Sequence, residues 1–251
     1  MTRIAWVTGA GKGIGRQVAL ELAKEGWQVM VSARTEADLD SLVQLSISLS
    51  GSIKAYPVDV TNENEVKEII HDIESKFGAI ELAILNAGTY IRSGVEEFSA
   101  KSFSKQLDVN VMGTVNCFEH VLENMKNRQS GHIVVVSSLS AYRGLPLASG
   151  YGASKAALTN MCEALKPELE MLGISLSVVH PGFVRTPLTS RNEFPMPFLM
   201  EVEDAARKII NGIENDKFEI TFPTPFALIM KLLRCLPYPI YFAITRRLLR
   251  K

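Results

Sequence analysis

The chain has 251 residues, of which 47% are hydrophobic and 22% charged, and its formal net charge at pH 7 is +0. This length suits one large α/β domain and does not require a second one. The composition is that of a globular protein and argues against disorder, while the balanced charge gives no support to a nucleic-acid partner.

Short apolar strands alternate with helical segments along the whole chain. Strands are expected at 3–9, 27–33, 53–60, 80–88, 131–138, 173–182 and 218–222, and helices at 13–25, 36–49, 62–76, 99–127, 151–172 and 202–214. Near-continuous apolar runs such as HIVVVS indicate strands that are buried on both faces, as in a parallel sheet. The alternation predicts an α/β, doubly wound (Rossmann) parallel sheet of about seven strands flanked by helices, in a single domain over residues 1–251.

A glycine-rich loop, VTGAGKGIG at residues 7–15, follows the first expected strand and opens the first helix. Its spacing is TGxxxGxG, and it also contains Lys12 and Ile14. Gly9, Gly13 and Gly15 allow the backbone to turn sharply and to approach a pyrophosphate, which binds at the N-terminus of a helix. The loop therefore predicts a nucleotide site.

The end of the second strand indicates which nucleotide is bound. An acidic residue about 20 positions beyond the glycines typically binds the ribose 2′-hydroxyl of NAD, whereas a nearby arginine accommodates the 2′-phosphate of NADP. Here Ala33 and Arg34 occupy that place, Glu36 comes later, and Lys12 adds a second positive charge on the same side. The sequence therefore predicts NADP(H) as cofactor in preference to NAD(H).

Further motifs follow the glycine loop along the chain: Asp59-Val60, Asn86-Ala87-Gly88, and Pro181-Gly182 with Thr186. Together with Thr8-Gly9, Gly13 and Gly15 they stand in the order typical of short-chain dehydrogenases/reductases, and the chain resembles that family over roughly residues 3 to 190. The resemblance implies that Asp59 and Val60 touch the adenine ring. It also implies that the Asn86 motif lies beside the cofactor and that the segment from Pro181 to Thr186 contacts the nicotinamide.

The resemblance extends to four candidate catalytic residues: Asn110, Ser138, Tyr151 and Lys155. Tyr151 and Lys155 are four residues apart and so share one face of a helix. A phenol with a pKa near 10 exchanges protons poorly at neutral pH, but a nearby ammonium and the charge of the oxidised nicotinamide would lower that pKa. Tyr151 is thus the expected general acid in reduction and base in oxidation.

By the same resemblance, Lys155 would hold the nicotinamide ribose, Ser138 would bond to the substrate oxygen, and Asn110 would position a water molecule. Ser137 competes with Ser138 for its role. Side chains alternate along a strand, so the two serines are expected on opposite faces, and we favour Ser138.

The segments 139–149 and 183–200 follow strands and are expected to border the substrate, with residues 187–215 as the substrate loop or lid region. Their apolar character suits a lipophilic carbonyl or alcohol substrate, although simple covering of the core explains it equally well. The protein is expected to be a homodimer or homotetramer.

The C-terminal segment, residues 222–251, departs from the family pattern. From residue 220 to the end there are six basic residues and no acidic one, and four prolines interrupt the apolar stretches. This pattern argues against a membrane-spanning helix of about 20 apolar residues and suits an amphipathic segment on anionic lipid. A subunit contact or a cover for the substrate cleft remain as alternatives.

The sequence as a whole predicts an NADP-dependent carbonyl reductase or alcohol dehydrogenase, cytoplasmic or peripherally bound to a membrane. The three cysteines have no metal-ligand spacing, so reduced thiols and no metal site are expected. A strand begins within the first ten residues and leaves no room for a signal peptide. The alternatives are a non-catalytic NADP-binding regulator and a nucleotide-sugar epimerase-like enzyme, which would usually need a longer C-terminal substrate domain.

Overall fold

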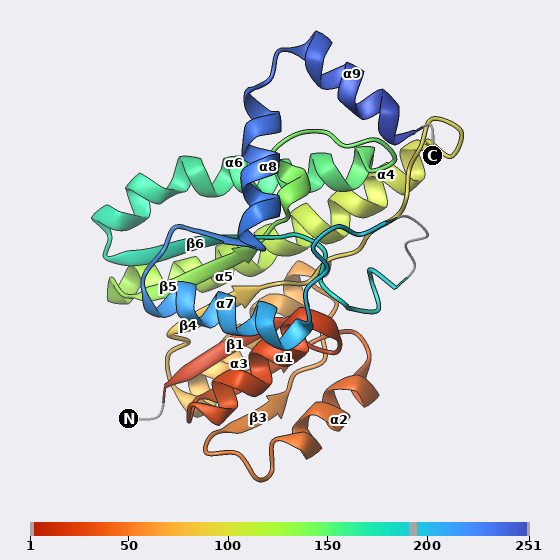
Figure 1. Cartoon of the computed structure of the whole chain (residues 1–251). Coiled ribbons are helices and arrows are strands. Elements are labelled where there is room, and N and C mark those ends of the chain that lie inside the picture. The colour runs from red at the N-terminus through yellow and green to blue at the C-terminus, as the bar shows by residue number, and fades with distance from the viewer. Residues whose placement is uncertain (1–2, 191–194, 250–251) are drawn as a thin grey trace.

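Seven parallel strands form the central sheet, in the order β3-β2-β1-β4-β5-β6-β7 (Figure 1). The computed structural model describes residues 3–190 and 195–249. Within them the strands are β1 (Ile4–Thr8), β2 (Gln28–Ser32), β3 (Ser52–Ala55), β4 (Leu82–Leu85), β5 (Gly131–Val136), β6 (Ile174–Pro181) and β7 (Glu219–Phe222). Every adjacent pair is parallel, so the predicted doubly wound sheet is confirmed.

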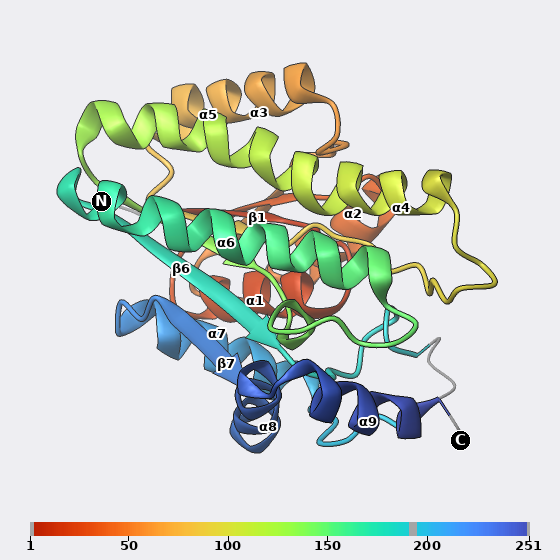
Figure 2. The same ribbon diagram turned by 90° about the horizontal axis from the view of Figure 1, so that it is seen from above.

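Helices cover both faces of the sheet (Figure 2). One layer contains α1 (Gly13–Lys24), α2 (Glu36–Leu45) and α7 (Val202–Glu214), and the other contains α3 (Glu63–Phe77), α5 (Gly113–Arg128) and α6 (Ser149–Met171). Alternate strand residues enter opposite cores: Val7 of β1 is buried beneath the first layer and Trp6 beneath the second. This two-sided burial explains why the strands read as unbroken apolar runs.

The long helical region expected over 99–127 is confirmed, and it consists of three consecutive elements. These are α4 (Ala100–Leu107), a π-helical turn at Asp108–Met112, and α5. The π-helical turn was not predicted because an α-turn and a π-turn differ by one residue, which the apolar spacing of the sequence does not reveal. The expected third strand is also too long: β3 ends at Ala55, and Pro57 supplies no backbone N–H to extend the ladder.

Two helices that the sequence did not predict form the C-terminal segment, α8 (Thr224–Cys235) and α9 (Tyr238–Leu248). Pro225 and Pro239 suggested breaks, but each lies in the first turn of its helix, where a missing N–H costs nothing. Among the residues described, no helix is both long and apolar enough to cross a bilayer.

The strand order reverses between β1 and β4: β2 and β3 lie to one side of this point, and β5, β6 and β7 to the other. In open parallel sheets, ligands bind at the carboxyl ends of the strands beside such a reversal. The loops that follow β1, β4, β5 and β6 therefore define the place where a site is expected.

Candidate active site

The glycine loop after β1 lies directly against the end of β4. Gly9 has φ +65, and a Cβ atom there would lie 2.7 Å from the Cα of Ala87. A Cβ atom on Gly15 would lie 2.5 Å from Nδ2 of Asn86. Only glycine fits at these two positions, since the backbone has no room for a side chain.

Hydrogen bonds hold the two loops together. The amide of Asn86 donates to the carbonyl oxygens of Thr8 and Gly9 at 3.1 and 3.2 Å. Oγ1 of Thr8 accepts from the backbone N–H groups of Asn86 and Ala87 at 3.0 and 3.1 Å. Sequence reasoning identified Thr8 only as a motif letter; its hydroxyl joins the glycine loop to β4.

The N-terminus of α1 fits an anionic group. Its N-cap, Lys12, makes no side-chain capping bond, so the N–H groups of the first turn keep their capacity to bind a phosphate. Together with the tight glycine loop, this is the chemistry that a pyrophosphate requires.

The two basic residues expected at the 2′-phosphate differ in their surroundings. Arg34 is exposed directly after β2 and has no acidic partner within 3–190 and 195–249. Nζ of Lys12, by contrast, lies 3.2 Å from a carboxylate oxygen of Asp38. Arg16, which the sequence reasoning missed, donates to the carbonyl oxygens of Gly11 and Asp38 and so fixes α2 beside the glycine loop.

Asp59 and Val60 lie in the loop between β3 and α3. A carboxylate oxygen of Asp59 accepts from both the backbone N–H and the hydroxyl of Thr61, at 3.0 and 2.8 Å. Val60 is buried against Gly113. The structure does not bring this pair to the cavity that contains Ser138, Tyr151 and Lys155.

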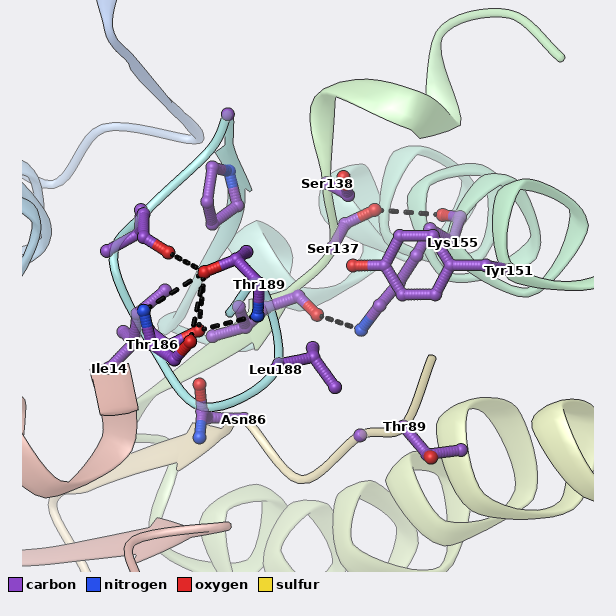
Figure 3. Close-up of a pocket in the computed structure, with 15 residues that line it drawn as sticks. Ile14, Asn86, Thr89, Ser137, Ser138, Tyr151, Lys155, Thr186, Leu188 and Thr189 are labelled. Carbon is purple, nitrogen blue, oxygen red and sulfur yellow. Dashed lines mark hydrogen bonds between the residues drawn. The ribbon is translucent and has the colours of Figure 1, made fainter. Parts of the chain in front are cut away.

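That cavity, of about 110 Å³, lies at the carboxyl ends of β4, β5 and β6 (Figure 3). Its lining includes nine of the predicted site residues: Ile14, Asn86, Gly88, Ser138, Tyr151, Lys155, Pro181, Gly182 and Thr186. It also includes residues that were not singled out: Thr89, Val136, Val184, Leu188 and Thr189. Residues 191–194 of the expected lid region lie outside the described residues.

Tyr151 is the central phenol of this cavity, and its ring meets that of Tyr90 edge to face at 5.2 Å between centroids. Burial raises the pKa of Tyr151, an interaction with the Ser138 hydroxyl lowers it, and Tyr90 raises it further. We expected Lys155 to lower this pKa. In the protein alone burial dominates, and Nζ of Lys155 lies 5.8 Å from the ring centroid.

Lys155 is buried on α6, and its ammonium donates to the carbonyl oxygen of Val136 at 2.8 Å. Burial lowers the pKa of Lys155 to about 8. The strand-derived carbonyl therefore fixes the position of this charge at the end of β5, on the same helix face as Tyr151.

The two neighbouring serines have different partners. The hydroxyl of Ser137 donates to the backbone oxygen of Lys155 at 2.9 Å and lies 3.0 Å from Oγ1 of Thr159. The hydroxyl of Ser138 accepts from the N–H and the hydroxyl of Ser140 and interacts with Tyr151. Ser137 thus fastens strand to helix, and Ser138 is the serine beside the phenol.

Asn110 lies in the π-helical turn and is fully buried. Its amide bonds to the backbone of Thr89 through both polar atoms and also donates to the hydroxyl of Ser154 at 2.9 Å. Asn110 does not line the cavity itself; it holds the chain that follows β4. Its expected contact with a water molecule stays a prediction.

The C-terminal segment packs on both expected substrate loops. Phe226 of α8 stacks on Phe183 and Phe198, with ring centroids 5.6 and 6.2 Å apart. Arg143 donates to three carbonyl oxygens at the end of α8, those of Leu233, Arg234 and Leu236. Its guanidinium also lies over the rings of Tyr238 and Tyr241. The inner face of the segment therefore covers the border of the cleft.

Comparison with known proteins identifies the family of the chain. The family model for short chain dehydrogenases matches residues 3–195. An uncharacterized oxidoreductase of Myxococcus xanthus is 35% identical over 246 residues, which cover 98% of this chain and 97% of the relative.

Solved structures share the fold. A short chain dehydrogenase/reductase from Burkholderia phymatum, solved in complex with NAD, has a TM-score of 0.85 at 24% identity, covering 92% of each chain. ElxO, solved with NADP bound, has a TM-score of 0.80 at 29% identity, covering 88% of this chain and 98% of its own. The chain belongs to the short-chain dehydrogenase/reductase family of oxidoreductases.

Proposed function

We propose that this protein transfers a hydride between NADP(H) and a carbonyl or secondary alcohol, and that the substrate is lipophilic. The observation that carries the proposal is the convergence of three groups on one cavity: the phenol of Tyr151, the hydroxyl of Ser138 and the ammonium of Lys155. These groups lie beside a glycine loop whose form suits a dinucleotide.

The residues present fit a nicotinamide cofactor. Gly9, Gly13 and Gly15 and the first turn of α1 would hold the pyrophosphate, and Lys155, Pro181 and Thr186 border the place of the nicotinamide end. When bound, the cofactor donates or accepts the hydride. ElxO was solved with NADP and the Burkholderia protein with NAD, so the preference for NADP rests on Arg34.

Residues of the protein carry out the proton transfer that accompanies hydride transfer. Oη of Tyr151 gives its proton to the substrate oxygen in reduction and takes one back in oxidation. Burial raises the pKa of Tyr151 and so favours the protonated phenol. The nearby ammonium of Lys155 and the positive charge of the oxidised nicotinamide would lower this pKa and ease proton transfer. The Ser138 hydroxyl would donate to the same substrate oxygen and stabilise its developing charge.

The substrate class follows from the apolar border of the cavity. Val184 and Leu188 line it, and Leu145 packs nearby with α8. Apolar walls with a few converging polar groups favour a substrate with a hydrocarbon portion. We also propose a homodimer or homotetramer in the cytoplasm, which sedimentation velocity and fractionation would test.

The test is an absorbance assay at the nicotinamide band with NADPH or NADH and ketones, aldehydes and alcohols of increasing chain length. We expect turnover with NADPH that improves with the apolar length of the substrate. Tyr151→Phe keeps the packing of the ring and removes its proton, so it should lose 10²- to 10⁴-fold in kcat, on the order of a general acid's contribution, and still bind NADPH.

Two results would contradict the proposal. Near-normal turnover by Tyr151→Phe would exclude the phenol as the acid. Tight NADPH binding with no turnover of any carbonyl compound would favour the non-catalytic regulator instead.

A further inference from the structure

The outer face of the C-terminal helices carries a large set of exposed apolar side chains. The outer face is defined here by Leu228, Ile229 and Leu232 of α8, and by Tyr238, Ile240, Phe242 and Ile244 of α9 with Leu249 beyond it. Leu228 and Leu232 are 62% and 65% exposed, and Tyr238 and Phe242 are 68% and 50% exposed. Exposed apolar side chains gathered on neighbouring helical turns mark an interaction site for a protein or a membrane.

The inner sides of the helices hold the segment in place and leave these side chains exposed, although Arg143 lies over the ring of Tyr238 and that ring stacks on Phe242. Ala227 and Met230 of α8 are buried against the loop after β5, and Tyr241 of α9 donates to the carbonyl oxygen of Gly144. Both helices lie at one edge of the molecule (Figures 1 and 2). The apolar residues of the outer face therefore lie outside the buried core clusters.

The charge around the outer face has one sign. Within 220–249 the basic residues are Lys231, Arg234, Arg246 and Arg247, and there is no acidic residue. Lys231 pairs with Glu219, while the three arginines have no acidic partner in the described part of the chain. Apolar side chains interleaved with unpaired arginines are the pattern of an interfacial helix on anionic lipid.

We infer that the outer face of α8 and α9 docks on the surface of an anionic phospholipid membrane. Charge favours lipid over a second copy of the chain. A two-fold symmetric dimer through this face would bring the same arginines of both copies together, with no carboxylate of 220–249 to compensate them. Anionic headgroups supply the missing negative charge, and the apolar side chains enter the acyl boundary.

The docked orientation would place the border of the cleft near the lipid, because α8 packs on Phe183 and on the loop that carries Arg143. Docking itself does not depend on the activity proposed above. It can therefore be measured without a substrate.

The experiment is co-sedimentation of the full chain with vesicles of phosphatidylcholine, with and without phosphatidylglycerol, at low and high salt. We expect binding to the anionic vesicles that weakens in salt, because the Debye length falls from about 30 Å at 0.01 M to about 3 Å at 1 M. Arg246→Gln with Arg247→Gln should weaken binding by about 25-fold, at about fivefold for each charge. Leu232→Ser with Phe242→Ser should weaken it at least about tenfold at both salt concentrations.

Matched controls lie on other faces. Ile47→Ser with Met171→Ser changes two apolar residues that are at least as exposed as Leu232 and Phe242, and Lys67→Gln with Lys208→Gln removes two exposed charges. Both controls should bind like the unmodified protein. All altered side chains are exposed, so thermal melting by circular dichroism should confirm that each variant folds.

Three results would overturn the inference. The first is that the unmodified protein stays in the supernatant with every vesicle. The second is that the controls lose as much vesicle binding as the α8–α9 variants, and the third is equal binding to neutral and anionic vesicles. The protein could also fail to bind vesicles and form a dimer without lipid. If Leu232→Ser with Phe242→Ser dissociated that dimer, the outer face would be assigned to a second copy of the chain.

Discussion

Asn110 and Thr89 face each other as a closed pair: Oδ1 of Asn110 accepts from the backbone N–H of Thr89 at 2.7 Å, and Nδ2 donates to the carbonyl oxygen of Thr89 at 3.0 Å. One side chain thus satisfies both backbone groups of a cavity-lining residue. The π-helical turn makes this contact available by widening the helix at Asn110.

Asn110→Ala should destabilise the protein, because it leaves the backbone groups of Thr89 and the hydroxyl of Ser154 without these partners. A buried unsatisfied polar group costs about 1–3 kcal/mol, so we expect a loss of that order or larger in urea denaturation. Asn116→Ala is the control, since this buried asparagine makes one bond, to the carbonyl of Val60. Equal losses in the two variants would contradict the prediction.

The two serines after β5 should separate catalysis from stability. Ser138→Ala removes the hydroxyl beside Tyr151 and should lower kcat. The groups of Ser140 that it leaves without a partner are only partly buried and can bind water instead, so the free energy of unfolding should change little. Ser137→Ala removes the bonds to Lys155 and Thr159, and should cost about 1 kcal/mol of stability per bond. Parallel kinetics and urea denaturation would check both, and a larger kcat loss in Ser137→Ala would reverse our assignment.

Arg34→Ala should weaken NADPH binding about tenfold or more and leave NADH binding nearly unchanged, because a charge-assisted bond contributes about 1.5–3 kcal/mol. Lys12→Ala should have a smaller effect, since its ammonium already pairs with Asp38. Fluorescence titration of both cofactors is the measurement. Tighter binding of NADH than of NADPH by the unmodified protein would refute the NADP assignment.

Lys155 should make stability depend on pH. Its pKa falls from 10.5 in the unfolded chain to about 8 on burial, so between these values the unfolded state holds a proton that the folded state has released. Stability therefore rises with pH across this window. Below pH 8 the buried charge lowers stability by its full amount, on the order of 3 kcal/mol.

Lys155→Met should lack this rise. Urea denaturation at intervals from pH 7 to 10.5 should show the unmodified protein gaining stability relative to the variant. Parallel profiles would mean that the pKa of Lys155 is not lowered in the folded protein.

The fold was predictable because buried strands and helices have recognisable patterns of apolar residues in the sequence. Strands such as β5 are unbroken apolar runs, and α7 has the same bounds as its expected helix, 202–214. The helices α8 and α9 were missed because the sequence does not distinguish a proline in the first turn of a helix from a proline that interrupts one. The two cases can be told apart only when the first residue of the helix is known, and tertiary contacts determine that residue.

The residues of the candidate site could be predicted where the chemistry requires a particular residue type. The contacts between residues of different elements could be predicted less well. The cavity gathers Ser138, Tyr151 and Lys155, as the motif order predicts. The Lys12–Asp38 pair could not be foreseen, because Asp38 is brought to the glycine loop by the orientation of α2. The hydrogen bonds between Asn110 and Thr89 likewise involve a π-helical turn that no residue type predicts.

Arg143 couples the loop after β5 to the C-terminal helices. Its guanidinium donates to three carbonyl oxygens at the end of α8 and lies over the rings of Tyr238 and Tyr241 in α9, while its backbone belongs to the loop that also carries Ser138. A ligand that pushes this loop outward must carry the corner between α8 and α9 with it. Under the docking inferred above, linkage is reciprocal: the factor by which a bound ligand changes the affinity for a membrane equals the factor by which the membrane changes the affinity for the ligand.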